Sequence, residues 1–427
     1  MSKIAIVNGR VIDPGTQLDE TGNVYVDDGK IISIAPSAPA NFNAQHTIDA
    51  SNHIVCPGFI ELCARLREPG QENKATIASE STAAIQSGFT TLCIPPDTDP
   101  VIDEPAVVEL IQKRAQRFKS PHILPLGAAT AKLAGQQLSE MAALKDAGCV
   151  GVSNALNPIQ DHRVLRRAME YAATYGLVFH VVPLDAALAN SGVAHEGAIA
   201  TRLGVAGIPA TAETVAIALY LELAASIGVK LHFGRISTAR GVLLIEEAKA
   251  EGLTVTADVA IHNLLLNDQA INGFNSQAHV LPPLRSEDDR QGLIAGVNSG
   301  TIDAICADHQ PHDADAKLNP FPATSPGISG LDTLLSLCLN LVDAKSVTLN
   351  RVLDAVTFQP AKILGADRGR LIPNAPADIC IFDPNTKFEI EGSAFFSAGK
   401  NTPFDGWHVR GKVVQTIVKG EPMLGKF

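Results

Sequence analysis

The 427-residue sequence lacks both a long uninterrupted apolar segment and a close pair of cysteines. Its most apolar helical stretch, residues 215–229, is broken by Glu222 and is too short to span a bilayer, so we expect a core helix there. The seven cysteines lie far apart, with no C-x-x-C motif, and their odd number argues against a disulfide framework. We therefore expect reduced thiols.

Positive charge is also scarce. The chain has 34 Lys and Arg against 45 Asp and Glu, a net charge of −11. This deficit argues against nucleic acid or an anionic membrane as a partner. The first residues show no basic start followed by an apolar core, so no export signal is expected. Together with the reduced thiols, these features predict a cytoplasmic protein.

Strand signals mark the two ends of the chain. Asn8-Gly9 and Asp28-Gly29 each lie between β-branched runs, which is a strong hairpin pattern. Similar patterns return at residues 369–384 and 407–423. Such strands need a second layer to cover their apolar face. We predict that residues 1–54 and 366–427 together form a small β-sandwich.

The region between the two ends alternates helical patterns with short apolar strands. The helical pattern at residues 76–88 precedes an apolar strand at 89–94, and this alternation continues along the chain. It predicts a parallel sheet, and the number of strands indicates an α/β fold, a (β/α)8 TIM-like barrel over residues 55–365. The proline-rich residues 309–330 are predicted to be a structured loop over the barrel mouth or a mobile lid.

The first barrel strand is predicted at PGFIEL, residues 57–62, and is followed by polar residues from Arg67 onward. In such barrels the chemistry lies at this C-terminal end of the strands. Here the chain resembles the dihydroorotase branch of the amidohydrolase superfamily. The resemblance covers nearly the whole sequence and rests most on a series of motifs in the same order: LREPGQENK, GFTTLC, LHFGRISTARG, PPLRSEDDR, GTIDAICADHQPH and NTPFDGW.

The resemblance implies hydrolysis of a cyclic amide by metal-activated water, with histidine and carboxylate ligands. The family's metal-ligand positions fall in this chain on Cys63, Arg65, Asn154, Val182, Arg235 and Asp308. A thiolate can bind zinc, but a guanidinium cannot, and Asp308 alone keeps the family's residue. One ligand of six cannot hold two cations, so we expect no zinc, no catalysis and a vestigial Asp308.

The substrate-binding positions are partly retained. Arg67 and His312 match residues that meet the substrate carboxylate in the family. Asp97 replaces an asparagine and would repel that carboxylate. A second asparagine is replaced by Leu281, and a Pro-His-His sequence by residues 261–263. The remaining site is therefore expected to bind the family's substrate poorly.

Loss of the metals would leave Asp308 buried and unpaired, at a considerable energetic cost. We therefore predict that Arg65 or Arg235 lies within salt-bridge reach of Asp308, since a guanidinium can replace a cation and bond a carboxylate. A competing use of these arginines, with Arg67, is an anion site for phosphate or carboxylate. Cys63 is expected to pack as a small buried residue.

Four histidines, His180, His262, His309 and His312, are expected to be hydrogen-bonded structural residues and not catalysts. The first functional hypothesis follows from the resemblance. The chain is similar to inactive dihydroorotase homologues, which assemble with aspartate carbamoyltransferase in pyrimidine biosynthesis, and we also expect it to self-associate as a dimer. Residues 309–330 and the loop near residues 95–105 are candidate partner-binding surfaces.

Two other functions stay open at this point. The chain could be a cyclic amide hydrolase with one zinc held by Cys63, Asp308 and either His262 or His309, since three ligands and a water suffice for catalytic zinc. It could also be a sensor that binds a carboxylated ligand through Arg67 and His312.

Overall fold

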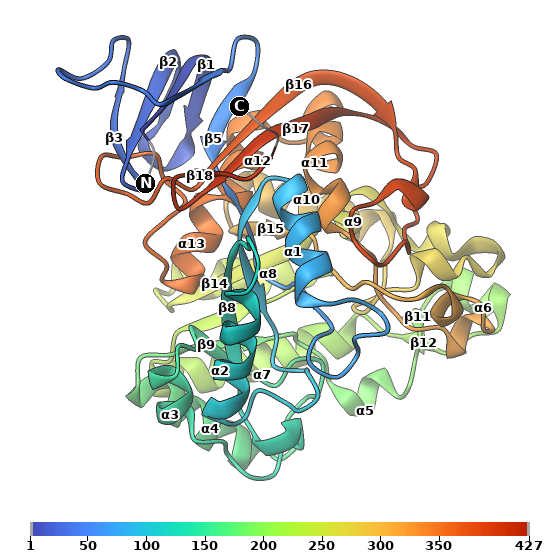
Figure 1. Cartoon of the computed structure of the whole chain (residues 1–427). Coiled ribbons are helices and arrows are strands. Elements are labelled where there is room, and N and C mark those ends of the chain that lie inside the picture. The colour runs from blue at the N-terminus through green and yellow to red at the C-terminus, as the bar shows by residue number, and fades with distance from the viewer. Residues whose placement is uncertain (1–2, 425–427) are drawn as a thin grey trace.

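The barrel and a terminal β-sheet account for most of the chain (Figure 1). The computed structural model describes residues 3–424. The barrel sheet has eight strands in the sequential order that the sequence predicts, and every neighbouring pair is parallel. Its strands are β6 (Phe59–Glu61), β7 (Phe89–Ile94), β8 (His122–Ala128), β9 (Gly151–Ser153), β10 (Val178–Val181), β13 (Leu231–Phe233), β14 (Val255–Ala260) and β15 (Ala304–Cys306). The predicted (β/α)8 barrel is confirmed.

The first and last barrel strands meet just beyond their C-terminal ends. The backbone N–H of His309 donates to the Cys63 carbonyl (3.0 Å), and the N–H of Arg65 donates to the His309 carbonyl (2.9 Å). The buried Glu61 side chain also accepts hydrogen bonds from the N–H groups of Ala307 (2.7 Å) and Asp308 (3.2 Å). The barrel therefore closes at the end where the family's chemistry would lie.

Helices cover the outside of the barrel. The first of them follows the predicted start at residue 76, where Thr76 forms a reciprocal capping box with Ser79. The outer helices are α1 (Ile77–Gln86), α2 (Pro105–Ala115), α3 (Met141–Asp146), α4 (His162–Thr174), α7 (Thr211–Ile227), α8 (Ala239–Ala250), α10 (Glu287–Ser299), α11 (Leu334–Asp343), α12 (Leu349–Val356) and α13 (Phe358–Leu364). No helix within residues 3–424 is long and apolar enough to cross a membrane.

Strands from the two chain ends, predicted to form a β-sandwich, are joined by hydrogen bonds in a single sheet. The strands lie in the order β18 (Glu421–Pro422), β17 (His408–Val418), β16 (Ile379–Glu389), β5 (Ile54–Pro57), β1 (Ile4–Asp13), β2 (Leu18–Asp27) and β3 (Lys30–Ala35), while β4 (His46–Asp49) also pairs with β1. The antiparallel pair of β5 and β16 joins the halves. The long hairpin of β16 and β17 extends over the barrel helices, and β17 contacts α11 and α1 (Figure 1).

A small satellite beside the barrel mouth is not apparent from the sequence. It contains the short elements α5 (Ala186–Ala189), β11 (Ala194–His195), α6 (Ala198–Leu203), β12 (Gly207–Ile208), η3 (Asp268–Phe274) and η4 (Ser276–Ala278), whereas α9 (Ile261–Leu265) packs on the main barrel core. Phe321 and Ile328 are buried in its apolar core. Residues 309–330 are thus packed and hydrogen-bonded, which agrees with a structured loop and not with a mobile lid.

Candidate functional site

Several residues at the ends of the barrel strands have an unusual backbone conformation. Arg67, Ala155, Arg235 and Asp308 all have positive φ, of 63°, 50°, 58° and 46°. A non-glycine residue in this region costs about 1–3 kcal/mol, and such residues gather at active sites. The backbone of a site is therefore present even though most of the side chains that would have used it have changed.

Asp308, almost fully buried at the end of β15, is held by both predicted arginines. Its Oδ1 atom lies 3.1 Å from Nη1 of Arg235 and 3.7 Å from Nη1 of Arg65. The Gln310 side-chain amide donates to Oδ2 (3.0 Å). The prediction that Arg65 or Arg235 lies within salt-bridge reach of Asp308 is confirmed, and both arginines do so.

Arg65 also uses a second carboxylate. Its Nε atom lies 2.8 Å from Oδ2 of Asp97, and this pair is largely buried. The sequence suggests that Asp97 would repel a substrate carboxylate. In the structure, Asp97 forms an ion pair with Arg65. Arg65 therefore links two aspartates, and its charge is balanced within the protein.

Cys63 lies against the same guanidinium groups. Nη1 of Arg235 donates to its Sγ atom, and Nη1 of Arg65 lies 3.6 Å from it. Burial raises the pKa of the Cys63 thiol to about 12, although both arginines oppose this rise. The side chain is therefore a thiol at neutral pH, packed against two guanidinium groups.

The remaining metal-ligand positions do not supply donors either. Asn154 donates from its amide to the carbonyls of Leu133 (3.2 Å) and Asn157 (2.7 Å) and accepts from Thr130 (2.7 Å). Val182 is a buried apolar residue. Within residues 3–424, no three His, Cys, Asp or Glu side chains are grouped so that they could hold a metal ion. The donor set does not fit the family's metals, because a guanidinium lies between Cys63 and Asp308.

Two of the histidines have clear structural surroundings. His309 is fully buried, and its Nε2 atom lies 2.7 Å from Glu80 Oε2, while its Nδ1 accepts from the N–H of Gly330 (3.1 Å). His309 therefore links α1 to the end of β15. His262 differs, because its Nδ1 atom is buried without a hydrogen-bond partner within residues 3–424, as is Nε2 of His180, so the prediction that these two are hydrogen-bonded is wrong. Burial lowers the pKa of His262 to about 4, so this side chain is neutral at neutral pH. The expectation that His309 is a hydrogen-bonded structural residue is confirmed.

A buried pair behind the mouth is missed by the sequence analysis. Nε2 of His232 lies 2.8 Å from Asp258 Oδ2, and the backbone N–H of Arg235 donates to Asp258 Oδ1 (2.7 Å). The ring of His180 lies 4.9 Å from that of His232. The sequence holds one sign of this pair. Thr256 and Asp258 are two residues apart in one strand, so both side chains lie on the same face of the sheet. Asp258 thus holds the strained backbone from which Arg235 reaches Asp308.

The substrate-side residues contact each other. Nη2 of Arg67 lies 3.1 Å from Nε2 of His312, and Nε of Arg67 donates to the Pro311 carbonyl (2.9 Å). Burial, reinforced by the nearby Arg65, lowers the pKa of Arg67 to about 10. Burial and the charge of Arg67 lower the pKa of His312 to about 3. Arg67 and His312 thus lie together, as the resemblance implies.

Little space is left at the mouth. The cavity beside Arg65 and Arg67 has a volume of about 20 Å³, and the one beside His180 and Arg235 about 30 Å³. A volume of about 10–15 Å³ is the minimum for one water molecule. These cavities therefore have room for one or two waters each, and not for a cyclic amide.

Comparison with known proteins agrees with this reading of the fold. A family model described as dihydro-orotase-like matches residues 52–240. A protein of Pseudomonas aeruginosa named dihydroorotase-like protein is 45% identical over 98% of both chains. The chain belongs to the dihydroorotase-like family. A dihydroorotase of Citrifermentans bemidjiense is 40% identical, again over 98% of both chains.

A solved hydantoinase structure has the same overall architecture. The L-hydantoinase (dihydropyrimidinase) of Arthrobacter aurescens superposes with a TM-score of 0.89 at 24% identity, covering 99% of this chain and 96% of the hydantoinase. At this identity the comparison establishes the amidohydrolase fold. The dihydroorotase-like family thus includes relatives named as enzymes and relatives named only as similar to them.

Proposed function

We propose that this chain is a non-catalytic member of the dihydroorotase-like family, which serves as a structural and assembly subunit for aspartate carbamoyltransferase in cytoplasmic pyrimidine biosynthesis. One observation carries the loss of catalysis. The Arg235 guanidinium lies between Cys63 and Asp308, where the family's chemistry needs a metal. A positive side chain there repels a dication and occupies its volume.

The rest of the molecule supports an assembly role because the fold does not depend on the lost chemistry. The barrel closes through backbone hydrogen bonds at residues 63–65 and 309, and its outer helices pack on a continuous core. A barrel with a closed mouth can therefore present a stable outer surface. The partnership with aspartate carbamoyltransferase comes from the family resemblance and is part of the proposal.

The alternative hydrolase with one zinc has weaker support. It requires Cys63, Asp308 and either His262 or His309 around one ion. His309 bonds to Glu80, away from Asp308, and the Cys63 sulfur lies against the guanidinium groups of Arg235 and Arg65. The sensor hypothesis is disfavoured by the small cavities beside Arg67.

Two measurements test the proposal. The native protein, produced in zinc-supplemented medium and purified without chelators, is expected to contain less than about one metal per ten chains and to leave dihydroorotate unchanged. Purified aspartate carbamoyltransferase from the same organism is expected to co-elute with it in size-exclusion chromatography. One or two bound metals together with turnover would overturn the loss of catalysis, and separate elution would overturn the assembly role.

A further inference from the structure

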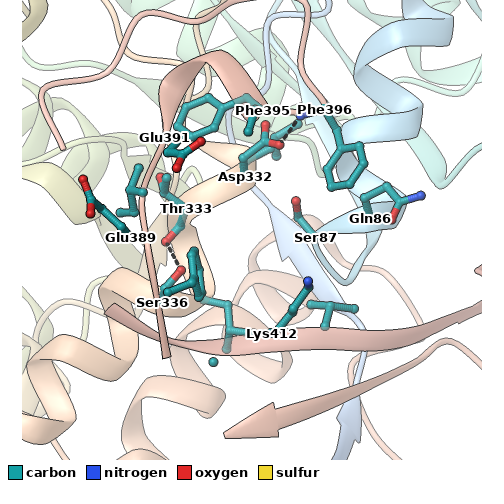
Figure 2. Close-up of a pocket in the computed structure, with 17 residues that line it drawn as sticks. Gln86, Ser87, Asp332, Thr333, Ser336, Glu389, Glu391, Phe395, Phe396 and Lys412 are labelled. Carbon is teal, nitrogen blue, oxygen red and sulfur yellow. Dashed lines mark hydrogen bonds between the residues drawn. The ribbon is translucent and has the colours of Figure 1, made fainter. Parts of the chain in front are cut away.

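A groove on the flank of the molecule has the features of a protein-docking site. The flank groove, of about 360 Å³, lies between the β16–β17 hairpin, α1 and α11, and is lined by Leu335, Phe388, Ile390, Phe395, Phe396 and Val413 (Figure 2). It is far larger than the cavities of the mouth and does not include any strand end of the barrel.

The loop that forms one wall of the flank groove is firmly held. The half-buried Asp332 carboxylate accepts hydrogen bonds from the backbone N–H groups of Phe396 (2.6 Å) and Ser397 (3.3 Å). Lys400 donates to the Ser397 carbonyl (2.9 Å), and Ser397 donates to the buried Glu80 (2.7 Å). The groove is therefore preorganised, which lowers the entropic cost of binding.

Two aromatic side chains are exposed on this rigid wall. Phe396 is 55% exposed and Phe388 is 37% exposed. Both lie beside the cavity, whose floor is apolar. Large aromatic residues next to a preformed apolar pocket are typical of the residues that dominate protein–protein binding energy.

The charge of the groove restricts its occupant. Glu389 and Glu391 lie on one side of the cavity, with Gln86 on the other (Figure 2). Neither glutamate forms an ion pair with any residue in the described part of the chain. Lys412 is the single cation that lines the groove, against these two glutamates and Asp332. The complementary surface is an apolar side chain flanked by lysine or arginine.

The position and charge of the groove decide between kinds of occupant. Small-molecule sites in these barrels lie at the C-terminal strand ends, whereas this groove lies on the outer flank. Two copies docked about a twofold axis would bring the same acidic groups together, because such an interface uses one surface twice. Both points favour a different protein.

We propose that the flank groove seats the carbamoyltransferase partner through an apolar side chain of that partner flanked by lysine or arginine. This inference rests on the proposed assembly function. It replaces residues 309–330 and 95–105 as the favoured contact surface, since Phe321 and Ile328 of the former segment are packed into the satellite core.

The test measures binding of the full-length chain to purified aspartate carbamoyltransferase by isothermal titration calorimetry. Phe396→Ser is expected to weaken binding about tenfold or more. Glu391→Lys is expected to weaken it several-fold and to reduce its dependence on salt, because an exposed charge contact is screened. The matched control is Leu318→Ser, which removes a side chain that is 77% exposed on the 309–330 segment; it should leave binding unchanged.

Each outcome has a distinct meaning. Absence of binding by the native chain overturns the proposed function and this partner together. Binding that survives Phe396→Ser and Glu391→Lys, but is lost in Leu318→Ser, overturns the groove alone. Dissociation of a homodimer by Phe396→Ser, measured by analytical ultracentrifugation, would assign the groove to a second copy. Because Glu391 is exposed, Glu391→Lys tests the proposal even if the Phe396 variant folds poorly.

Discussion

Buried carboxylates occur in two different settings in this barrel. Glu213, on α7, accepts hydrogen bonds from the backbone N–H groups and hydroxyls of Ser237 and Thr238. Asp308, at the mouth, is held by the side chains of Arg235 and Arg65. The first setting holds the loop after β13 against a helix, and the second brings two arginines to a carboxylate at the barrel mouth.

Glu80 is a second buried carboxylate of the kind represented by Glu213. Burial alone would raise its pKa, but hydrogen bonds from His309, Ser397 and Ser79 outweigh this and lower it. Its partners come from the end of β15 and from the C-terminal segment, so it joins three parts of the chain. A carboxylate with fixed partners in several elements cannot change without cost to the fold, whereas Asp308 is held mainly by two arginine side chains at the mouth.

The largest expected effect therefore comes from the first setting. Glu213→Ala leaves the N–H groups of Ser237 and Thr238 buried without acceptors, and should cost about 4 kcal/mol of unfolding free energy. Urea denaturation followed by circular dichroism measures this loss. Glu222→Ala, at an exposed position of the same helix, is the control and should change stability by less than about 0.5 kcal/mol.

Substitution at the barrel mouth should lower the unfolding free energy less, and a second substitution should restore it. Arg235→Met leaves Asp308 with the more distant Arg65 and should cost about 3 kcal/mol, since one partner of a buried pair is lost. Adding Asp308→Leu should recover most of this loss, because an apolar replacement of a buried pair is often neutral. A double variant as unstable as the sum of both single changes would mean that Asp308 also supports the fold.

A smaller loss of stability is expected at the mouth when the pH is lowered. Burial lowers the pKa of His262 to about 4 from its ordinary value of 6.5. Below pH 6.5 the unfolded chain binds a proton that the folded chain rejects, so stability falls as the pH drops from 6.5 toward 4. His262→Phe should reduce this fall by about 2 kcal/mol, as measured by denaturation at several pH values. His46→Gln, at an exposed position, should leave the fall unchanged.

Local patterns were enough to predict the barrel. Apolar strand runs and helix starts such as Thr76 depend on neighbours in sequence, and the predicted order of eight strands holds. The salt bridge of Arg235 and Asp308 could also be predicted, because burial of an unpaired carboxylate is costly. The family resemblance identified the two positions. The energetic cost of an unpaired buried carboxylate predicted that they form a salt bridge.

Features made by distant segments could not be predicted in this way. The flank groove combines the end of α1, the start of α11 and residues 388–396, which no local pattern brings together. The same holds for the contact of Glu80 with Ser397, 317 positions apart. The prediction that Asp97 would repel a ligand overlooked its pairing with Arg65 for a related reason, since that contact depends on the orientation of two loops.

Asn154→Asp gives the smallest expected effect and separates ancestry from present structure. By the family resemblance, position 154 is a metal-ligand position. On that ground alone the substitution would restore a ligand and leave stability unchanged. In the structure the Asn154 amide donates to the carbonyls of Leu133 and Asn157, so a carboxylate would face two acceptors and lose both bonds. The variant should lose about 1–2 kcal/mol of stability and bind no zinc, measured by denaturation and metal analysis. Asn157→Asp, at an exposed neighbouring position, is the matched control. Zinc uptake by the variant would show that the Arg235 guanidinium can leave the former metal volume.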